Sequence, residues 1–287
     1  MNVYKRRAYA KINLTLDVTG VEQSYHLLDS LVASVDLYDD IKLTVRADDY
    51  STVRTQGMGS ENIPPETNNA LKTAFAFSKK FKTAGVDIVI KKNIPLGGGL
   101  GGSSADASGV LYGMAKLFGV TDAQAVEELA DSLGSDTRYM IHGGFKRMQG
   151  RGNIVKETGI DTALHLLLLC PSSTVSAGAC YKKYDELPKT LEWKPSSTEE
   201  CIKALKDGNI AEACKYVSND LYIPALHLNA DVERAKKQMQ ELGPMVAGMT
   251  GSGSCVFGIF PTAKACNAAK KRYQGEFCVI ATKTVTP

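Results

Sequence analysis

The stretch Pro95-Leu-Gly-Gly-Gly-Leu-Gly-Gly-Ser-Ser-Ala-Asp106 holds the densest cluster of glycines in the chain. Apolar residues alternate over 86–90 before it, which predicts a strand, and recur at helical spacing over 110–118 after it, which predicts a helix that Gly119 can end. A glycine loop in this place lets backbone N–H groups approach an anion, and the helix N-terminus adds its positive end. The stretch therefore predicts a polyphosphate-binding loop. A flexible surface turn is the alternative, but such turns rarely need so many glycines.

The surrounding sequence excludes the commonest phosphate-loop patterns. Gly97, Gly99 and Gly102 match G-x-G-x-x-G, but the dinucleotide fingerprint needs a second strand with an acidic residue about 20 positions on. Residues 122–133 have a helical pattern instead. The Walker A pattern needs a Gly-Lys dipeptide, which the chain lacks, and the protein-kinase signatures H-R-D and D-F-G are missing too.

Helical and strand patterns are interleaved along the rest of the chain. Residues 8–18 place apolar side chains at period two from Ile12 to Val18, which predicts a half-buried strand whose polar face, with Lys11, points away from the core. The other expected elements are strands at 41–45, 164–170 and 255–260, helices at 69–82, 122–133, 198–206, 210–216, 231–242 and 262–273, and loops at 48–67. This order favours an α+β fold, and we expect two domains, residues 1–160 and 161–287.

Composition and charge restrict the class of protein. Hydrophobic residues make up 44% of the 287 residues and charged residues 23%, so the chain can bury a sizeable core. The net charge of +3 and the single Trp argue against a nucleic-acid-binding module. The seven cysteines form no C-x-x-C pair, so we expect reduced thiols and no metal-ligand cluster. With no secretory signal and no long apolar stretch, we expect a cytoplasmic protein.

Three motifs together resemble those of the GHMP small-molecule kinases, named for galactokinase, homoserine, mevalonate and phosphomevalonate kinases. The stretch quoted above resembles their phosphate loop, P-x-x-x-G-L-x-x-S-S-A. Ala10-Lys-Ile-Asn-Leu-Thr-Leu-Asp-Val18 resembles their N-terminal motif, and Met249-Thr-Gly-Ser-Gly-Ser-Cys-Val-Phe-Gly258 their C-terminal glycine motif. Within the family, the chain is most similar to the branch that phosphorylates the 2-hydroxyl of a cytidine-bearing sugar alcohol in the non-mevalonate isoprenoid pathway. The residues that carry this likeness are Tyr25-His26, Gly134-Ser-Asp136, Gly150-Arg-Gly152 and Asn219-Asp-Leu221.

The resemblance implies an α+β fold with the two-domain architecture of GHMP kinases and an active site in the cleft between the domains. It implies an ATP-dependent phosphotransferase with an alcohol acceptor, and Mg²⁺ is expected because the phosphates of ATP require charge neutralisation. The expected partner is a small-molecule substrate, with no nucleic acid and no membrane. The expected oligomeric state is a monomer or a homodimer.

The resemblance also implies roles for particular residues. Lys11 and Asp136 match the catalytic pair: Asp136 would orient and deprotonate the acceptor hydroxyl, while Lys11 would hold Asp136 ionised and offset charge on the phosphoryl oxygens. The residues expected to bind ATP are Asn69, Pro95, Gly97, Gly98, Gly99, Leu100, Gly101, Gly102, Ser103 and Ser104. The residues expected to bind the acceptor are Asn13, Tyr25, His26, Thr250, Gly251, Ser252 and Gly253.

The chain departs from the pattern of this branch in two specificity segments. Val21-Glu-Gln-Ser-Tyr-His26 stands in place of Arg-x-Asp-Gly-Tyr-His, and Thr137-Arg-Tyr139 in place of a small apolar residue, Pro and Phe. The guanidinium of Arg138 could lower the pKa of Asp136 or meet a different substrate anion. Three hypotheses stay open: a diverged kinase of the cytidine-bearing alcohol, a paralogue acting on a different small alcohol, and a catalytically silent nucleotide-binding regulator. Retention of the catalytic pair and both glycine loops argues against the third.

Overall fold

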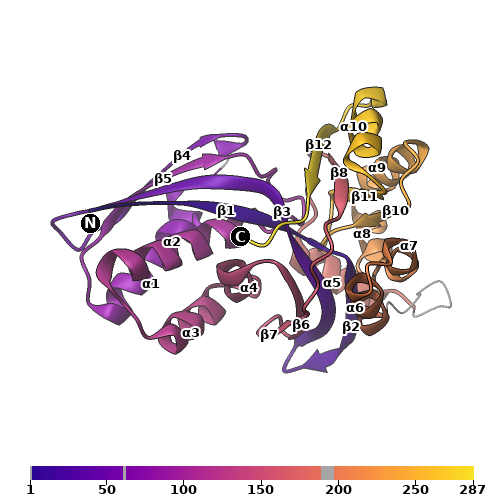
Figure 1. Ribbon diagram of the computed structural model, residues 1–287. Helices are drawn as coiled ribbons and strands as arrows, with labels where there is room; N and C mark the ends of the chain where they lie inside the picture. The colour runs from indigo at the N-terminus through magenta and orange to yellow at the C-terminus, as the bar shows by residue number, and fades with distance from the viewer. Residues whose placement is uncertain (1, 61–62, 189–196) are drawn as a thin grey trace. The chain divides into compact units, whose positions relative to one another are not determined.

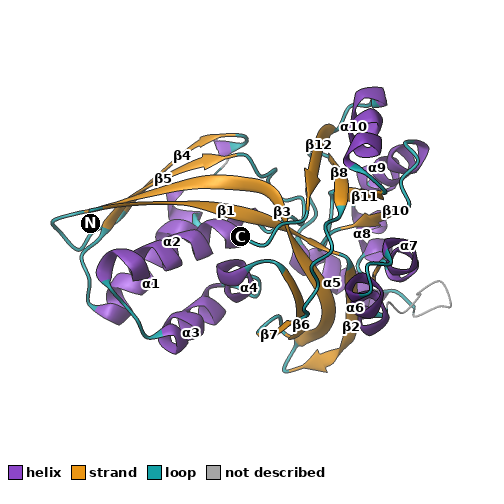
Figure 2. Ribbon diagram, viewed as in Figure 1, coloured by secondary structure: helices purple, strands orange, loops and turns teal. Residues whose placement is uncertain are grey.

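Two compact units make up the chain in a computed structural model that describes residues 2–60, 63–188 and 197–287. The first unit contains the described residues up to 10 together with those of 37–95 and 101–143. The second contains 11–36, 96–100 and the described residues of 144–287. Each unit mixes helices and strands, as Figures 1 and 2 show, so the expected α+β class is confirmed. Strands β1 (Val3–Asn13) and β3 (Tyr25–Val45) contribute residues to both units.

Helices cover one face of the sheet in the first unit (Figure 1). β4 (Thr52–Gly57) pairs in parallel with β5 (Val86–Lys92), which pairs antiparallel with the 40–45 part of β3. The helical segments are the 3₁₀ turn Pro65–Thr67, α1 (Asn69–Phe81), α2 (Gly102–Phe118), α3 (Ala123–Leu133) and α4 (Thr137–His142). Helix α2 packs tightly on β3, because a Cβ at Gly109 would overlap the buried side chain of Ile41.

The second unit contains two groups of paired strands. In one, β3 pairs antiparallel with β2 (Thr15–Glu22) and β6 (Phe145–Gly150), β6 continues to β7 (Ile154–Glu157), and β9 (Ser218–Asn219) pairs in parallel with β2. The other is an antiparallel sheet in the order β10-β11-β8-β12. Its strands are β8 (His165–Cys170), β10 (Val246–Met249), β11 (Val256–Phe260) and β12 (Cys278–Lys283).

Two helices bury one face of that antiparallel sheet. Met239 of α9 (Ala230–Glu241) and Ala269 of α10 (Ala263–Arg272) join Leu167 and Val256 in one hydrophobic cluster. The other helical segments of this unit are α5 (Ala177–Glu186), α6 (Thr198–Lys206), α7 (Ile210–Ala213), the 3₁₀ turn Cys214–Tyr216 and α8 (Tyr222–Leu228). None of the described helices combines the length and apolar character needed to cross a membrane. All seven cysteines are free thiols.

One predicted loop is partly wrong. Within 48–67, which the sequence suggested to be loops, residues 52–57 form the strand β4, while residues 61 and 62 lie outside the described range. Among the described strands, β4 pairs with β5 alone, and it buries none of its residues fully. A strand of this kind keeps a polar sequence without apolar alternation, so its pattern resembles that of a loop.

The strand predicted over 8–18 is wrong in two respects. It divides at Leu14 into β1 and β2, and its polar residues Lys11, Asn13 and Thr15 are buried rather than facing away from the core. Burial of these groups is tolerable because each is hydrogen-bonded. The hydroxyl of Thr15, for example, accepts a hydrogen bond from the backbone N–H of Leu31 at 2.8 Å.

The hairpin between β2 and β3 turns through Gln23 and Ser24. Glu22 pairs with Tyr25, so the loop has two residues, and both adopt positive φ, 47° and 67°. Two-residue hairpin loops with positive φ at both positions favour Asn-Gly or Asp-Gly, because an L side chain is strained in this conformation. The turn thus forms without its preferred residues.

Glycine at position 24 should relieve this strain. We expect Ser24→Gly to raise the free energy of unfolding by about 0.5–1 kcal/mol. Val21→Gly, in the β2 strand of the same hairpin, should lower it by about 1 kcal/mol, because glycine in a strand loses more backbone entropy on folding. Urea denaturation followed by circular dichroism measures both changes. Destabilisation of equal size in the two variants would contradict the left-handed turn.

Candidate active site

In the first unit, the glycine loop ends at a helix N-terminus that is open to a ligand. Gly101, with φ of 74°, caps α2 without any side-chain hydrogen bond. The backbone N–H groups of Gly102, Ser103 and Ser104 therefore have no acceptor within the helix. Asn69, the first residue of α1, donates from Nδ2 to the Ser103 hydroxyl at 2.8 Å. Amides and hydroxyls at the start of a 17-residue helix form a favourable site for phosphate.

The segment that carries Asp136 lies beside this helix start. A Cβ on Gly134 would lie 3.9 Å from the Ser104 hydroxyl oxygen. Asp136 then occupies the N-cap position of α4, where its carbonyl accepts a hydrogen bond from the N–H of Met140 at 3.0 Å. Its side chain is half-buried. The first unit thus brings the predicted acid–base residue into the neighbourhood of the predicted phosphate-binding amides.

Arg138 is engaged away from this site. Its Nε and Nη2 donate to the two carboxylate oxygens of Asp131 on α3 at 2.8 and 2.7 Å, and Nη1 lies 3.1 Å from Glu127 of the same helix. The hydrogen bonds to Asp131 raise the pKa of Arg138 further above its usual value. The guanidinium therefore joins α3 to the start of α4, and the contacts give no support to a role in meeting a substrate anion.

In the second unit, the two glycine loops pack backbone against backbone. The Thr250 hydroxyl donates to the Gly99 carbonyl at 3.2 Å, and the Cys255 N–H donates to the Gly98 carbonyl at 3.2 Å. A Cβ on Gly99 would overlap the carbonyl oxygen of Thr250, and one on Gly98 would overlap the Cys255 sulfur. Burial raises the pKa of Cys255 well above its ordinary value, so this thiol stays uncharged.

The end of β1 completes this contact. Lys11 is 5% exposed; its N–H donates to the Leu100 carbonyl at 2.9 Å, and its Nζ donates to Asn13 Oδ1 at 2.6 Å. The same Asn13 oxygen accepts from the Gly251 N–H at 3.1 Å, and the Thr250 hydroxyl accepts from the Asn13 N–H at 3.1 Å. One asparagine thus links the lysine to the second glycine loop.

A second asparagine also holds that loop. Asn219 Nδ2 donates to the carbonyls of Met249 at 2.9 Å and Gly251 at 2.8 Å. The neighbouring Asp220 accepts from the N–H of Val18 in β2 at 2.8 Å. The Asn219-Asp-Leu221 motif therefore fixes the shape of the loop. The sequence spacing alone does not predict this role.

Tyr25 and His26 lie at the start of β3, where the sequence did not reveal their neighbours. His26 stacks on Tyr181 with ring centroids 4.7 Å apart and bonds through Nε2 to Asp185 at 2.8 Å. Tyr25 is 59% exposed, and the Arg151 guanidinium lies over its ring at 4.4 Å. Tyr181 and Asp185 belong to α5, a helix that we did not predict. The i, i+4 spacing of Tyr181 and Asp185, which places both on one face of a helix, was the sequence signal that could have identified them as partners of one residue.

The structure thus gathers the predicted residues in three places. Asn69, Ser103, Ser104 and the segment of Asp136 lie together in the first unit, where Pro95 is also buried. A second group of predicted residues is connected by hydrogen bonds in the second unit, and Ser252 and Gly253 follow in the same turn. The members of this group are Lys11, Asn13, Gly98, Gly99, Leu100, Thr250 and Gly251. Gly97 packs there against Thr174. Tyr25 and His26 form the third group.

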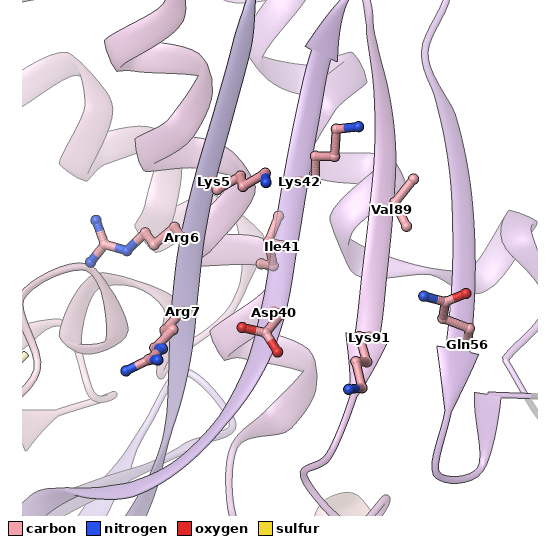
Figure 3. Close-up of a pocket in the computed structure, with 9 residues that line it drawn as sticks. All are labelled: Lys5, Arg6, Arg7, Asp40, Ile41, Lys42, Gln56, Val89 and Lys91. Carbon is pink, nitrogen blue, oxygen red and sulfur yellow. The ribbon is translucent and has the colours of Figure 1, made fainter.

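Figure 3 shows a different hollow, of about 530 Å³, on the sheet of the first unit. Its lining includes the exposed side chains of Lys5, Arg7, Lys42 and Lys91, whereas Arg6 turns away and donates to the Ile141 carbonyl at 2.8 Å. None of the predicted ATP or acceptor residues lines it. Charged side chains on the solvent face of a sheet whose other face carries helices are expected, so we assign this hollow no role.

Comparisons with known proteins give a consistent result. The model of the GHMP kinases N terminal domain matches residues 68–145, and that of the GHMP kinases C terminal domain matches residues 201–277. The predicted boundary at residue 160 falls between these matches and stays a prediction. A 4-diphosphocytidyl-2-C-methyl-D-erythritol kinase of Clostridium tetani is 35% identical over 262 residues, covering 90% of this chain and 91% of that protein. Its namesake from Caldicellulosiruptor saccharolyticus is 37% identical over 258 residues, covering 88% and 87%.

Solved structures agree with these relatives. A crystal structure of 4-(cytidine 5'-diphospho)-2C-methyl-D-erythritol kinase superposes with a TM-score of 0.80 at 25% identity, covering 98% of this chain and 99% of that one. The homoserine kinase of Cytophaga hutchinsonii superposes with a TM-score of 0.75 at 16% identity, covering 100% and 95%, and shows a shared fold.

The contact between the glycine loops leaves no space for a side chain at position 99. We expect Gly99→Ala to lower the free energy of unfolding by about 2–4 kcal/mol without any nucleotide, because the new Cβ meets the Thr250 carbonyl oxygen. Gly119→Ala is the matched control: φ is similar, 67° against 75°, but nothing lies within 4 Å of the added carbon. The control should cost about 1 kcal/mol. If thermal denaturation shows equal losses of stability in Gly99→Ala and Gly119→Ala, the positive φ, and not the contact with Thr250, requires glycine at position 99.

Proposed function

The chain belongs to the GHMP kinase family, and on that basis we propose that it transfers the γ-phosphate of ATP to the 2-hydroxyl of 4-diphosphocytidyl-2-C-methyl-D-erythritol. The observation that carries most weight is the packing of Lys11 and Asn13 against both glycine loops. Asn13 Oδ1 accepts from both the Lys11 ammonium and the Gly251 N–H, and positive groups gathered in this way suit the transfer of a highly charged phosphoryl group. Relatives that bear the name of this kinase over nearly the whole chain support the choice of acceptor.

On the ATP side, the amides at the start of α2 would hold the phosphates. The N–H groups of Gly102, Ser103 and Ser104 point along the helix axis, where the helix dipole favours negative charge. The hydrogen bond from Asn69 fixes the Ser103 hydroxyl beside them. These groups are built into a helix, so little reorganisation is needed when the triphosphate binds.

Mg²⁺ would be bound chiefly through the phosphates themselves. The described residues contain no group of three His, Cys, Asp or Glu side chains able to hold a metal ion. Magnesium in phosphoryl-transfer sites usually takes only one or two protein ligands, and the Ser103 hydroxyl at the helix start fits that requirement. The ion would supply neutralisation of the phosphate oxygens.

Asp136 and Lys11 would carry out the chemistry. Asp136 would accept the proton of the attacking hydroxyl and hold that oxygen in line with the γ-phosphate. Lys11 would offset the negative charge that develops on the phosphoryl oxygens. In a loose transition state, positioning by these two groups contributes more than proton removal.

The cytidine end of the acceptor would lie at the hairpin that begins β3. Tyr25 presents an exposed ring, and His26 is held against Tyr181 by stacking. Aromatic faces and a ring nitrogen can stack on and hydrogen-bond to a pyrimidine base. A cytoplasmic location and a monomeric or homodimeric state complete the proposal; both rest on the resemblance and on sequence features alone.

A panel of acceptors distinguishes the three open hypotheses. Purified protein with MgATP is given 4-diphosphocytidyl-2-C-methyl-D-erythritol, homoserine or mevalonate, and ADP release is measured. We expect turnover with the cytidylated acceptor alone. Turnover only with another alcohol would show a paralogue of different specificity, and ATP binding without turnover on any acceptor would show a silent nucleotide-binding protein.

Asp136→Asn tests the chemical role directly. We expect kcat to fall at least about a hundredfold, because the amide cannot accept the hydroxyl proton. ATP affinity, measured by calorimetry, should change less than about twofold, since the amides that bind phosphate are untouched. Asp49→Asn, an exposed carboxylate in the same unit before β4, is the control and should keep kcat. An Asp136→Asn variant of near wild-type rate would refute the assigned role.

A further inference from the structure

Three buried charged side chains lie beneath the phosphate loop, and none of them has a role in the chemistry proposed above. Lys92, the last residue of β5, is 2% exposed. Its Nζ forms ion pairs with Asp39 of β3 and with Asp106 of α2, the latter at 2.6 Å. Asp39 is fully buried and Asp106 is 5% exposed. All three residues belong to the first unit.

Asp39 holds the chain that leads into the loop. Its Oδ1 accepts hydrogen bonds from the backbone N–H groups of Asn93 at 2.6 Å and Ile94 at 2.9 Å. The next residue is Pro95, where the glycine loop begins. One carboxylate therefore fixes both peptide groups immediately before the loop, while its other oxygen holds Lys92.

Asp106 holds the chain that leaves the loop. It lies on α2 just after the amides expected to bind phosphate, and its Oδ2 accepts from Lys92. A Cβ on Gly102 would lie 3.7 Å from Lys92 Nζ, so the ammonium sits directly behind the first turn of the helix. One lysine thus connects the two ends of the loop, residues 93–94 and residue 106.

Stability alone does not account for this arrangement. Taking three ionisable groups out of water is costly, and apolar residues of similar volume often stabilise a protein as well or better. Oδ1 of Asp106 is buried and has no hydrogen-bond partner in the described part of the chain, which adds to the cost. A network that is expensive for folding but geometrically specific is more readily explained by positioning.

The electrostatics fit a site for a triphosphate. Burial, only partly opposed by Lys92, raises the pKa of Asp106 to about 8. Burial alone would lower the pKa of Lys92, but the carboxylates of Asp106 and Asp39 outweigh it and raise that pKa. Burial thus disfavours a full negative charge on Asp106, directly behind the amides expected to bind phosphate.

We propose that Lys92 is a positioning residue for ATP, which acts with Asp39 and Asp106 to hold the two ends of the phosphate loop at a fixed separation. The loop amides are then preorganised before the triphosphate arrives, which lowers the entropy cost of binding. This inference rests on the proposed function only in taking ATP as the ligand, and it does not depend on which alcohol is the acceptor.

Lys92→Met is the first test. We expect the dissociation constant of MgATP, measured by calorimetry without acceptor, to rise about tenfold or more. In turnover assays KM for ATP should rise equally, while kcat and KM for the acceptor change less than about threefold, the signature of lost ground-state binding. Lys91→Met, an exposed lysine on the same strand, is the matched control and should leave every constant unchanged. Thermal melting establishes that each variant is folded at the assay temperature.

A second pair of variants decides the matter should Lys92→Met not fold. Asp106→Ala removes the link to α2 but keeps the pair between Lys92 and Asp39, and should weaken MgATP binding about five- to tenfold. Asp106→Asn keeps an oxygen acceptor for Lys92 without negative charge, and should recover most of that affinity. Ser108→Ala, a buried polar truncation on the same helix, is the control and should affect stability alone.

The outcomes separate this inference from the proposed function. Folded Asp106→Ala that binds MgATP as tightly as the wild type would overturn the inference, whatever the acceptor. Equal loss in Asp106→Ala and Asp106→Asn would show a structural rather than a positioning role and would also overturn it. A wild type that binds ATP but phosphorylates none of the tested alcohols would overturn the acceptor assignment. The MgATP dissociation constants of the variants would then still test the positioning role of Lys92. A wild type that binds no ATP would overturn both.

Discussion

Backbone contact between two glycine loops, at Gly99 and Thr250, is the constraint on which the second unit's site depends. Gly99 and Thr250 are 151 positions apart in the chain, and the loops leave no space for a side chain on Gly99. Side chains restrict Gly97 and Gly98 as well, because an added Cβ would overlap Thr174 at the first and Cys255 at the second. The glycine cluster therefore serves packing as well as the phosphate binding proposed for it, because close approach of two backbones and access of amides to an anion both require the absence of Cβ.

The loop contact also explains why the end of β1 buries polar residues. Lys11 and Asn13 lie against the two loops, and their polar atoms are paired with carbonyls, amides or each other. The same asparagine oxygen that accepts from Lys11 also fixes Gly251. A movement of the second glycine loop would therefore shift Asn13 and, with it, the Lys11 ammonium.

In the first unit, buried ion pairs rather than backbone contacts hold the ends of the glycine loop. A loop rich in glycine is flexible, and flexibility must be lost when it closes around phosphates. Asp39 and Asp106, joined through Lys92, hold the two ends of the loop where they leave regular structure. In our proposal, their cost in desolvation is offset by a loop that is ordered before its ligand binds. Asn69 extends this order to the hydroxyl of Ser103.

The sequence by itself determined many of the elements, and it determined the family. The alternation over 86–90, the helix after the glycine loop and the three motifs each depend on residues close together in the chain, and these predictions were confirmed. Only the tertiary structure decided that Lys11 faces inward, that β4 is a strand, that Arg138 turns to α3 and that α5 supplies partners for His26. Each of these depends on a partner distant in the sequence, and local periodicity carries no information about which distant polar group will satisfy a buried one.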